Sequence, residues 1–180
     1  MDYGLFYYPG FVSLSSYSDS DWAGDESTYQ STQGYVFMIN GGAVSWNSSL
    51  QSLITLSSTE AEYLGACNAA CEAVWLRIVL KELRLRQRGP TRIHVDNESC
   101  IALSKNAVFH KRTKHIPLKY HKVREFVAKM VIELEPVQTY LQATDMFTKA
   151  VELKQLKMCR DLISLSSVIS QPSMAQEGDC

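Results

Sequence analysis

Leu56-Ser-Ser-Thr-Glu-Ala-Glu-Tyr63 begins the longest helical pattern in the sequence. Ser57 precedes Glu60 by three positions, which is the spacing of a capping box at a helix N-terminus. Apolar residues then recur at intervals of three and four, which predicts one apolar helix face. The residues of this face are Leu64, Cys67, Cys71, Val74, Trp75 and Ile78. We therefore expect a long helix, ended by Gly89-Pro90, in which both cysteines and Trp75 are buried.

The residues before this helix favour strands. Residues 11–19 alternate loosely between apolar and polar side chains. Residues 34–40 form a second β-rich run, and a glycine pair turns the chain back into residues 43–46, which predicts a hairpin. We also expect a short strand over residues 52–56 and a place in the core for Trp46.

The residues after the long helix predict further strands and helices. The expected elements are a strand over 91–95, a short helix over 97–104, a helix over 117–129, a strand over 131–137 and a helix over 141–165. Three antiparallel strands followed by βα units make an α/β fold, in which helices cover the faces of a mixed sheet.

The charge distribution is uneven, although the net charge is only −1. Residues 1–76 contain no lysine or arginine, so all 18 basic residues lie in the remainder of the chain. Within that remainder, residues 105–124 contain basic residues and histidines but no acid. This separation suits an enzyme that acts on nucleic-acid phosphates, and the alternative is a set of solvated charged faces.

The composition argues against several classes of protein. No run approaches the ~18 apolar residues of a membrane span, so we expect no transmembrane helix and no membrane partner. The first residues lack the basic and apolar regions of a secretory signal. Five cysteines at unpatterned spacings indicate reduced thiols. These features predict a cytoplasmic or nuclear protein that is not secreted.

Four acids stand where secondary structure can bring them together. Asp19 ends the first strand and Asp96 directly follows the strand over 91–95, so both lie at strand ends, where α/β sheets bind ligands. Glu62 lies in the second turn of the long helix, and Asp145 lies near the start of the last helix. Clustered carboxylates repel one another and bind divalent cations, Mg²⁺ or Mn²⁺ rather than zinc. Two such ions would support phosphodiester hydrolysis.

Several stretches that include these acids occur in the order and spacing of a known family. They are Tyr17-Ser-Asp-Ser-Asp-Trp-Ala-Gly-Asp25, Ser31-Thr-Gln-Gly-Tyr-Val-Phe37, Gly42-Ala-Val-Ser-Trp46, residues 56–63, Trp75-Leu-Arg77, Val95-Asp-Asn97, residues 110–116, Tyr120-His121 and residues 142–149. Through them the chain resembles the ribonuclease H domain of a copia-type LTR-retrotransposon Pol polyprotein. The resemblance implies a ribonuclease H-like fold, an α/β fold whose five-stranded mixed sheet is flanked by helices.

The resemblance also implies an activity, a cofactor and a site. Members of the family bind two Mg²⁺ ions, for which Mn²⁺ can substitute, and hydrolyse the RNA strand of RNA/DNA hybrids. Matched residue by residue, the catalytic and metal-binding carboxylates are Asp19, Glu62, Asp96 and Asp145. Asp21 is a weaker candidate for the ligand on the first strand, and Glu60 is the capping acid of the helix.

The basic stretch after residue 105 is the predicted contact surface for nucleic acid. The candidate residues are Asn97, Lys111, Arg112, Lys114, His115, Lys119 and His121. Arg112 and Lys114 would contact phosphates, because proteins recognise a hybrid duplex by shape and backbone contacts. Asn97 can instead cap the helix that follows it. A zinc site built from the histidines of this stretch lacks a matching cysteine or carboxylate pattern.

Some positions depart from the family pattern. Basic residues that are usual before the second strand and after the Trp46 segment are replaced by residues 28–31 and by Ser49-Leu50. Ala143-Thr144 stands where Leu-Ala is usual, and residues 137–142 contain no histidine, whereas relatives of this fold have one shortly before the last aspartate. Fewer phosphate contacts weaken binding at moderate salt, so we expect an impaired nuclease. The alternative is a domesticated, weakly active or inactive module that acts by binding nucleic acid or a host protein.

The resemblance divides the chain into three parts. Residues 1–11 are the expected remnant of a connection to an upstream reverse transcriptase, and residues 12–163 are the ribonuclease H-like domain. Residues 164–180 are the expected disordered tail, rich in serine and glutamine. In the parent element, the implied partners are an RNA/DNA hybrid and the reverse transcriptase, inside a cytoplasmic virus-like particle.

Overall fold

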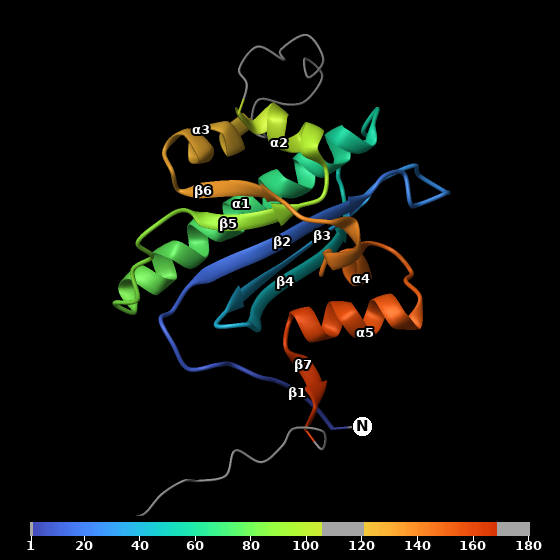
Figure 1. Ribbon diagram of the computed structural model, residues 1–180. Coiled ribbons are helices and arrows are strands. Elements are labelled where there is room, and N and C mark those ends of the chain that lie inside the picture. The colour runs from blue at the N-terminus through green and yellow to red at the C-terminus, as the bar shows by residue number, and fades with distance from the viewer. Residues whose placement is uncertain (1, 106–120, 169–180) are drawn as a thin grey trace, which may run out of the picture.

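The main sheet has five strands in the order β4-β3-β2-β5-β6 (Figure 1). The structure, a computed structural model, describes residues 2–105 and 121–168. The strands are β2 (Leu14–Asp21), β3 (Thr32–Ile39), β4 (Gly42–Leu50), β5 (Thr91–Val95) and β6 (Ile132–Pro136). β2, β3 and β4 pair antiparallel, whereas β2 with β5 and β5 with β6 pair parallel. The predicted α/β fold with a five-stranded mixed sheet is confirmed.

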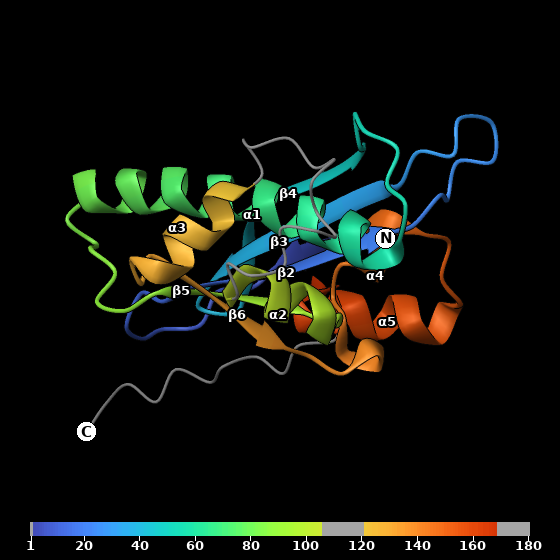
Figure 2. The same cartoon turned by 90° about the horizontal axis from the view of Figure 1, so that it is seen from above.

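Helices cover both faces of this sheet (Figures 1 and 2). α1 (Ser58–Glu82), α2 (Glu98–Lys105) and α3 (Lys122–Ala128) lie on one face. The short α4 (Asp145–Thr148) and α5 (Leu153–Leu162) lie on the other. Successive strand residues point to opposite faces, so β3 contributes Phe37 to the core under α1 and Val36 and Met38 to the core under α4.

The N-terminus of α1 is capped as predicted. The Ser57 hydroxyl accepts a hydrogen bond from the Glu60 N–H (3.3 Å), and the Glu60 carboxylate accepts one from the Leu56 N–H (2.9 Å). The first bond satisfies one of the backbone donors that a helix start leaves open, and the second ties Glu60 to the residue before the cap. They also fix the register of the first two turns, which contain Glu62.

The buried face of α1 differs from the predicted one. It consists mainly of small residues, among them Ala61, Gly65, Ala66, Ala69, Ala70 and Ala73. These residues let the helix lie close to β2, whose inward-facing residues include three buried serines. Cys67 is buried, but Cys71 is exposed, and Trp75 and Trp46 are 56% and 57% exposed. The predicted burial of these last three side chains is wrong. Cys71 and Trp75 lie off the face of α1 that packs closely on β2, and Trp46 lies on β4, outside that contact.

The alanine content of α1 also affects the membrane prediction. Among the described residues, α1 is the one helix that is long and apolar enough to cross a bilayer, with a mean hydropathy of 1.2 over an 18-residue window. The expectation that no segment reaches that composition is therefore wrong. More than half of the window is buried inside the protein, as in the core helix of a globular domain.

α1 ends at Glu82, earlier than the predicted Gly89-Pro90. The Leu85 N–H bonds to the Leu80 carbonyl (2.8 Å) and the Arg84 N–H to the Lys81 carbonyl (3.0 Å), the pair of bonds that defines a Schellman motif. Arg84 adopts the left-handed conformation, with φ of 63°. Glycine is the usual residue at this position, and a residue with a Cβ costs about 1–2 kcal/mol there.

A second, two-stranded sheet joins the two ends of the described chain. β1 (Tyr3–Leu5) pairs antiparallel with β7 (Leu165–Ser167), below the main sheet in Figure 1. Residues 165–167 were expected to belong to a disordered tail, whereas they form a strand, since three residues are too few to show a period. The domain limits at residues 12 and 163 stay predictions.

Two further elements differ from the prediction. Residues 52–56 contain no strand; after β4 the chain turns toward α1, and the Thr55 carbonyl accepts a hydrogen bond from the Trp22 indole (3.1 Å). The single helix expected over 141–165 is instead a 3₁₀ turn (Thr139–Leu141), α4 and α5, separated by extended backbone at Lys149. The expected helix over 117–129 begins outside the described residues, and its described part starts at Lys122.

We predict that Gly34→Ala destabilises the contact between β3 and α4. An added Cβ would lie 2.9 Å from the Phe147 Cβ and 3.0 Å from the Thr148 Cγ2. Such overpacking costs about 1–3 kcal/mol, which urea denaturation can measure as a lower free energy of unfolding. Gly89→Ala is the control, because an added Cβ there meets nothing within 4 Å. Equal effects of the two substitutions would contradict this role of Gly34.

Candidate metal centre

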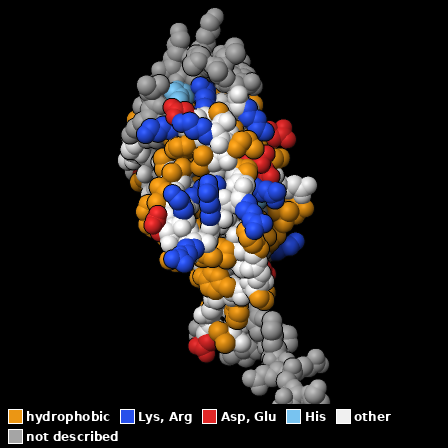
Figure 3. All heavy atoms as spheres, turned by 90° about the vertical axis from the view of Figure 1, so that its left-hand side faces the viewer, with side chains coloured by type: hydrophobic (Ala, Val, Ile, Leu, Met, Phe, Trp, Pro, Cys, Tyr) orange, Lys and Arg blue, Asp and Glu red, His pale blue; other side chains and the backbone are white. Residues whose placement is uncertain are grey.

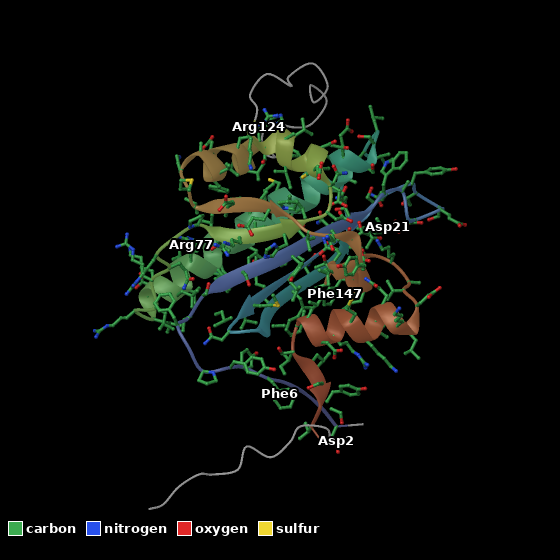
Figure 4. The ribbon with its side chains drawn as sticks, viewed as in Figure 1. Asp2, Phe6, Asp21, Arg77, Arg124 and Phe147 are labelled. Carbon is green, nitrogen blue, oxygen red and sulfur yellow. The ribbon has the colours of Figure 1, made fainter. Side chains whose placement is uncertain are left out.

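Three of the four predicted carboxylates meet at one edge of the sheet. Asp19 lies near the end of β2, Asp96 directly follows β5, and Glu62 lies in the second turn of α1. β2 and β5 are parallel, so their carboxyl ends share this edge, near Asp21 in Figure 4. One carboxylate oxygen from each of the three residues lies within 4.8 Å of the others. Asp19 and Glu62 are buried, and Asp96 is half-buried. We call these three residues the carboxylate cluster.

Glu62 occupies the least favourable position for a negative charge. Its Oε1 accepts a hydrogen bond from the Ser20 N–H (3.2 Å), whereas its buried Oε2 has no hydrogen-bond partner among the described residues. Burial, followed by the charges of Asp19 and Asp96, raises the pKa of Glu62 to about 9. A buried oxygen without a donor is therefore available to a cation.

Asp145 lies beside the cluster rather than within it. Its Oδ1 forms an ion pair with the Lys149 ammonium at 2.8 Å, and the same ammonium lies 3.9 Å from the Asp19 Oδ2. Burial and the charge of Asp19 raise the pKa of Asp145 despite this ion pair. Burial alone would lower the pKa of Lys149, but the neighbouring carboxylates raise it overall. Lys149 thus joins the fourth carboxylate to the cluster as a shared cation.

Gln142 holds the segment that carries Asp145 against the sheet. This fully buried side chain donates from Nε2 to the Ser18 carbonyl of β2 (3.0 Å). Its Oε1 accepts a hydrogen bond from the Thr144 hydroxyl (2.8 Å). Thr144, the polar residue directly before Asp145, is therefore hydrogen-bonded without contacting the carboxylates. The Thr148 hydroxyl donates to the Asp19 carboxylate from one turn further on.

Three residues of this site, Gln142, Thr148 and Lys149, were not expected from the sequence. A local signal for two of them exists, since Thr148 and Lys149 follow Asp145 by three and four positions. Residues at those spacings share one helix face and can contact each other. No local pattern reveals the bond from Gln142 to Ser18, because the two residues are far apart in the sequence.

The predicted nucleic-acid contacts are described only in part. Lys111, Arg112, Lys114, His115 and Lys119 lie outside the described residues. The Asn97 side chain accepts a hydrogen bond from the Cys100 N–H (3.0 Å), so it caps α2, the alternative considered for it. His121 is half-buried, and its Nδ1 lies 3.2 Å from the Tyr63 hydroxyl. Trp22 is about half exposed and is anchored through its indole N–H, which donates to the Thr55 carbonyl.

The donor set of the cluster fits a hard divalent cation. All three side chains offer carboxylate oxygens, two of them are buried, and one buried oxygen of Glu62 lacks a hydrogen-bond donor among the described residues. Carboxylates of this kind bind Mg²⁺ or Mn²⁺ in preference to zinc. The arrangement can therefore hold a divalent metal at the carboxyl ends of β2 and β5.

Comparison with known proteins relates the chain to part of a larger polyprotein. No protein-family model matches it. It is 40% identical over 154 residues to the "Retrovirus-related Pol polyprotein from transposon TNT 1-94" of Nicotiana tabacum. The aligned region covers 86% of this chain but only 12% of that relative. The chain therefore corresponds to a small segment of the polyprotein.

Comparison with solved structures concerns the fold. A ribonuclease H1 isolated from compost by a metagenomic approach superposes with a TM-score of 0.55, over 76% of this chain and 92% of that one, at 14% identity. The N-terminal RNase H domain of a Mycobacterium tuberculosis protein gives the same TM-score over 83% and 97% of the two chains, at 13% identity. At such identities the likeness establishes a shared fold.

We predict that the metal-free protein loses stability as the pH rises. The pKa of Glu62 is 4.5 in its ordinary setting and about 9 in the folded chain. The stabilisation that comes with its protonation is therefore fully present below about pH 4.5 and is lost as the pH rises through about 9. Thermal unfolding in EDTA should show a lower Tm at pH 8 than at pH 5. Addition of Mg²⁺ should raise the Tm more at pH 8 than at pH 5. Glu62→Gln should flatten the pH dependence; an unchanged slope in that variant would contradict the assignment.

We predict that Lys149→Gln increases the affinity of the site for divalent cations. The ammonium stands beside two carboxylates, so its charge opposes the binding of a second cation. Its removal should lower the dissociation constant for Mn²⁺ about three- to tenfold in calorimetric titration and should lower the metal-free Tm. Lys154→Gln, at an exposed position of α5, is the matched control. Weaker Mn²⁺ binding by Lys149→Gln would refute this account.

Proposed function

Because the chain has the ribonuclease H fold and is homologous over most of its length to a segment of retrotransposon Pol polyproteins, we propose that it is a metal-dependent endonuclease that hydrolyses the RNA strand of RNA/DNA hybrids. One observation carries the proposal. It is the cluster of Asp19, Glu62 and Asp96, two of them buried and one half-buried, at the sheet edge where α/β folds bind ligands.

The proposed cofactor is a pair of Mg²⁺ ions, for which Mn²⁺ can substitute. Asp19, Glu62 and Asp96 would hold them, and Asp145 would complete the set once its ion pair with Lys149 loosens. Bound ions of this kind activate a water and stabilise the leaving oxygen of a phosphodiester. The orphaned Oε2 of Glu62 supports a cofactor of this charge and chemistry.

The protein itself contributes positions and a dry environment. The Ser20 N–H orients the Glu62 carboxylate, and the Thr148 hydroxyl orients that of Asp19. Gln142 holds the segment of Asp145 against β2. These contacts come from backbone groups and buried side chains, so the cluster is held in place before substrate arrives, which lowers the cost of ordering it.

The proposed substrate and cellular setting follow from the resemblance. A hybrid duplex would meet the basic stretch around residues 111–119, outside the described residues, together with His121. In a polyprotein, the neighbouring upstream domain would be a reverse transcriptase, and the activity would remove template RNA. We propose a cytoplasmic virus-like particle or the nucleus as its location.

The proposal predicts that Asp96→Asn abolishes cleavage. The purified chain is incubated with a hybrid labelled on each strand, in Mg²⁺, Mn²⁺ or EDTA. We expect metal-dependent cutting of the RNA strand only, reduced at least about 100-fold in Asp96→Asn, since removing one charged group from a catalytic centre has effects of that order. Asp21→Asn is the matched control, because it makes the same chemical change two residues beyond Asp19 and should retain activity.

Each other outcome has a definite meaning. Cutting that survives Asp96→Asn would come from a contaminant or another site and would refute the role of the cluster. Binding of the hybrid without cutting, even in Mn²⁺, would refute the nuclease and leave the alternative of an inactive module that binds nucleic acid or a host protein.

A further inference from the structure

A strongly basic surface lies at the end of the molecule opposite the carboxylate cluster. It comprises Arg77, Lys81, Arg84, Arg86, Arg88 and Arg92, from the end of α1, the following loop and the start of β5. Figure 3 shows Lys and Arg side chains gathered among hydrophobic ones on this face. In Figure 4, Arg77 lies at the opposite end of the sheet from Asp21. We call this group the arginine patch.

Most of the patch is not neutralised. Lys81, Arg84 and Arg86 are exposed and form no ion pair with the described residues, and Glu82 is the one acid within residues 77–92. Arg92 is paired with Glu135 (3.2 Å), and Arg77 is tied to the Gly89 carbonyl and the Thr91 hydroxyl. Burial, followed by the charge of Arg86, lowers the pKa of Arg77. The patch thus contains mutually repelling cations that an anion would stabilise.

The surface around these cations is hollowed. Three adjoining hollows of about 600, 380 and 230 Å³ surround the loop after α1. Arg88 and Phe11 line the two larger ones, and Arg86 lines the two smaller ones. The guanidinium of Arg88 lies over the exposed Phe11 ring, 5.1 Å from its centre. Cations interleaved with an exposed aromatic ring are typical of surfaces that bind nucleic acid.

Arg84 provides an independent argument. It occupies the left-handed position of the Schellman motif, where a glycine would relieve strain. Its side chain makes no hydrogen bond or ion pair with the described residues that would compensate for this conformation within the fold. An anionic ligand that pairs with the Arg84 guanidinium would account for an arginine at this strained position, whereas contacts within the fold do not.

We propose that the arginine patch binds the phosphate backbone of an RNA/DNA hybrid at a second site, remote from the carboxylate cluster. The choice of a nucleic acid as the polyanion rests on the proposed function. Ser13, Leu14 and Ser15 line the largest hollow, and Asp19 lies five residues beyond Leu14 along β2. At about 3.3 Å per residue the separation is about 17 Å, or about five nucleotide steps of a duplex strand. A hybrid must therefore extend at least that far past the cleavage site to reach both surfaces.

Fluorescence anisotropy in EDTA tests this second site without relying on cleavage. The probes are a hybrid of about four base pairs, joined by a short linker so that it stays paired and too short to span about five nucleotide steps, and one of about twenty. We expect Arg86→Glu/Arg88→Glu to weaken binding of the long hybrid at least about tenfold and to leave the short one unchanged. The slope of log K against log salt should fall by about 1 for each phosphate that the variant no longer neutralises.

Arg84→Gly separates binding from folding. We expect weaker binding of the long hybrid, with a Tm that is unchanged or a few degrees higher, because glycine relieves the strained conformation. The matched control for Arg86→Glu/Arg88→Glu is Lys154→Glu/Lys157→Glu, which changes the net charge by the same amount on α5 and should retain binding of the long hybrid.

Several results would overturn the proposal. One is equal weakening of binding for the short and long hybrids, and another is equal weakening in the α5 control, which would indicate net charge alone. Competition by polyglutamate as strong as that by the hybrid would assign the patch to an acidic protein instead. A chain that binds the long hybrid through the patch but cuts neither probe in Mg²⁺ would refute the nuclease and not the patch.

Discussion

The repulsion among buried carboxylates at the edge of β2 and β5 is the constraint on which the rest of the site depends. Asp19, Glu62 and Asp96 come from three different elements, and burial, followed by the charges of the two aspartates, raises the pKa of Glu62 to about 9. Without a metal, part of the charge is removed by protonation and part is offset by Lys149. In the metal-free site, a proton on Glu62 and the Lys149 ammonium therefore reduce the repulsion that a divalent ion would otherwise offset.

Close approach of the elements makes this concentration of charge possible. α1 can lie near β2 because its inner face contains many alanines and Gly65, and α4 can lie on β3 because Gly34 has no side chain. Larger residues at these positions would move Glu62 or Thr148 away from Asp19. Trp75 and Ile78 lie away from this close contact and are exposed.

Local patterns in the sequence predicted most of the sheet, the helix cap and the meeting of Asp19, Glu62 and Asp96. Strand ends and helix starts are short-range features, so their residues can be placed from neighbours alone. The buried face of α1 was predicted wrongly because hydrophobic periodicity gives weight to Trp75 and Cys71, whereas packing distance favours alanine. The bond from Gln142 to Ser18 and the pairing of β1 with β7 join distant parts of the chain, and no local pattern encodes such contacts. The break between α4 and α5 also depends on tertiary contacts, because Lys149, where the backbone becomes extended, lies beside the carboxylates of Asp19 and Asp145.

The pairing of β1 with β7 has a mechanical consequence. Tyr3 pairs with Ser167 and Leu5 with Leu165, so the flanking chain enters and leaves from the same end of this small sheet. Polypeptide attached on both sides can therefore run away from the main sheet together, without crossing the edge that carries the carboxylates. Tension applied through such flanks would break the residue pairs of β1 and β7 one after another, as in unzipping. The two-stranded sheet would therefore open before any force reached the five-stranded sheet.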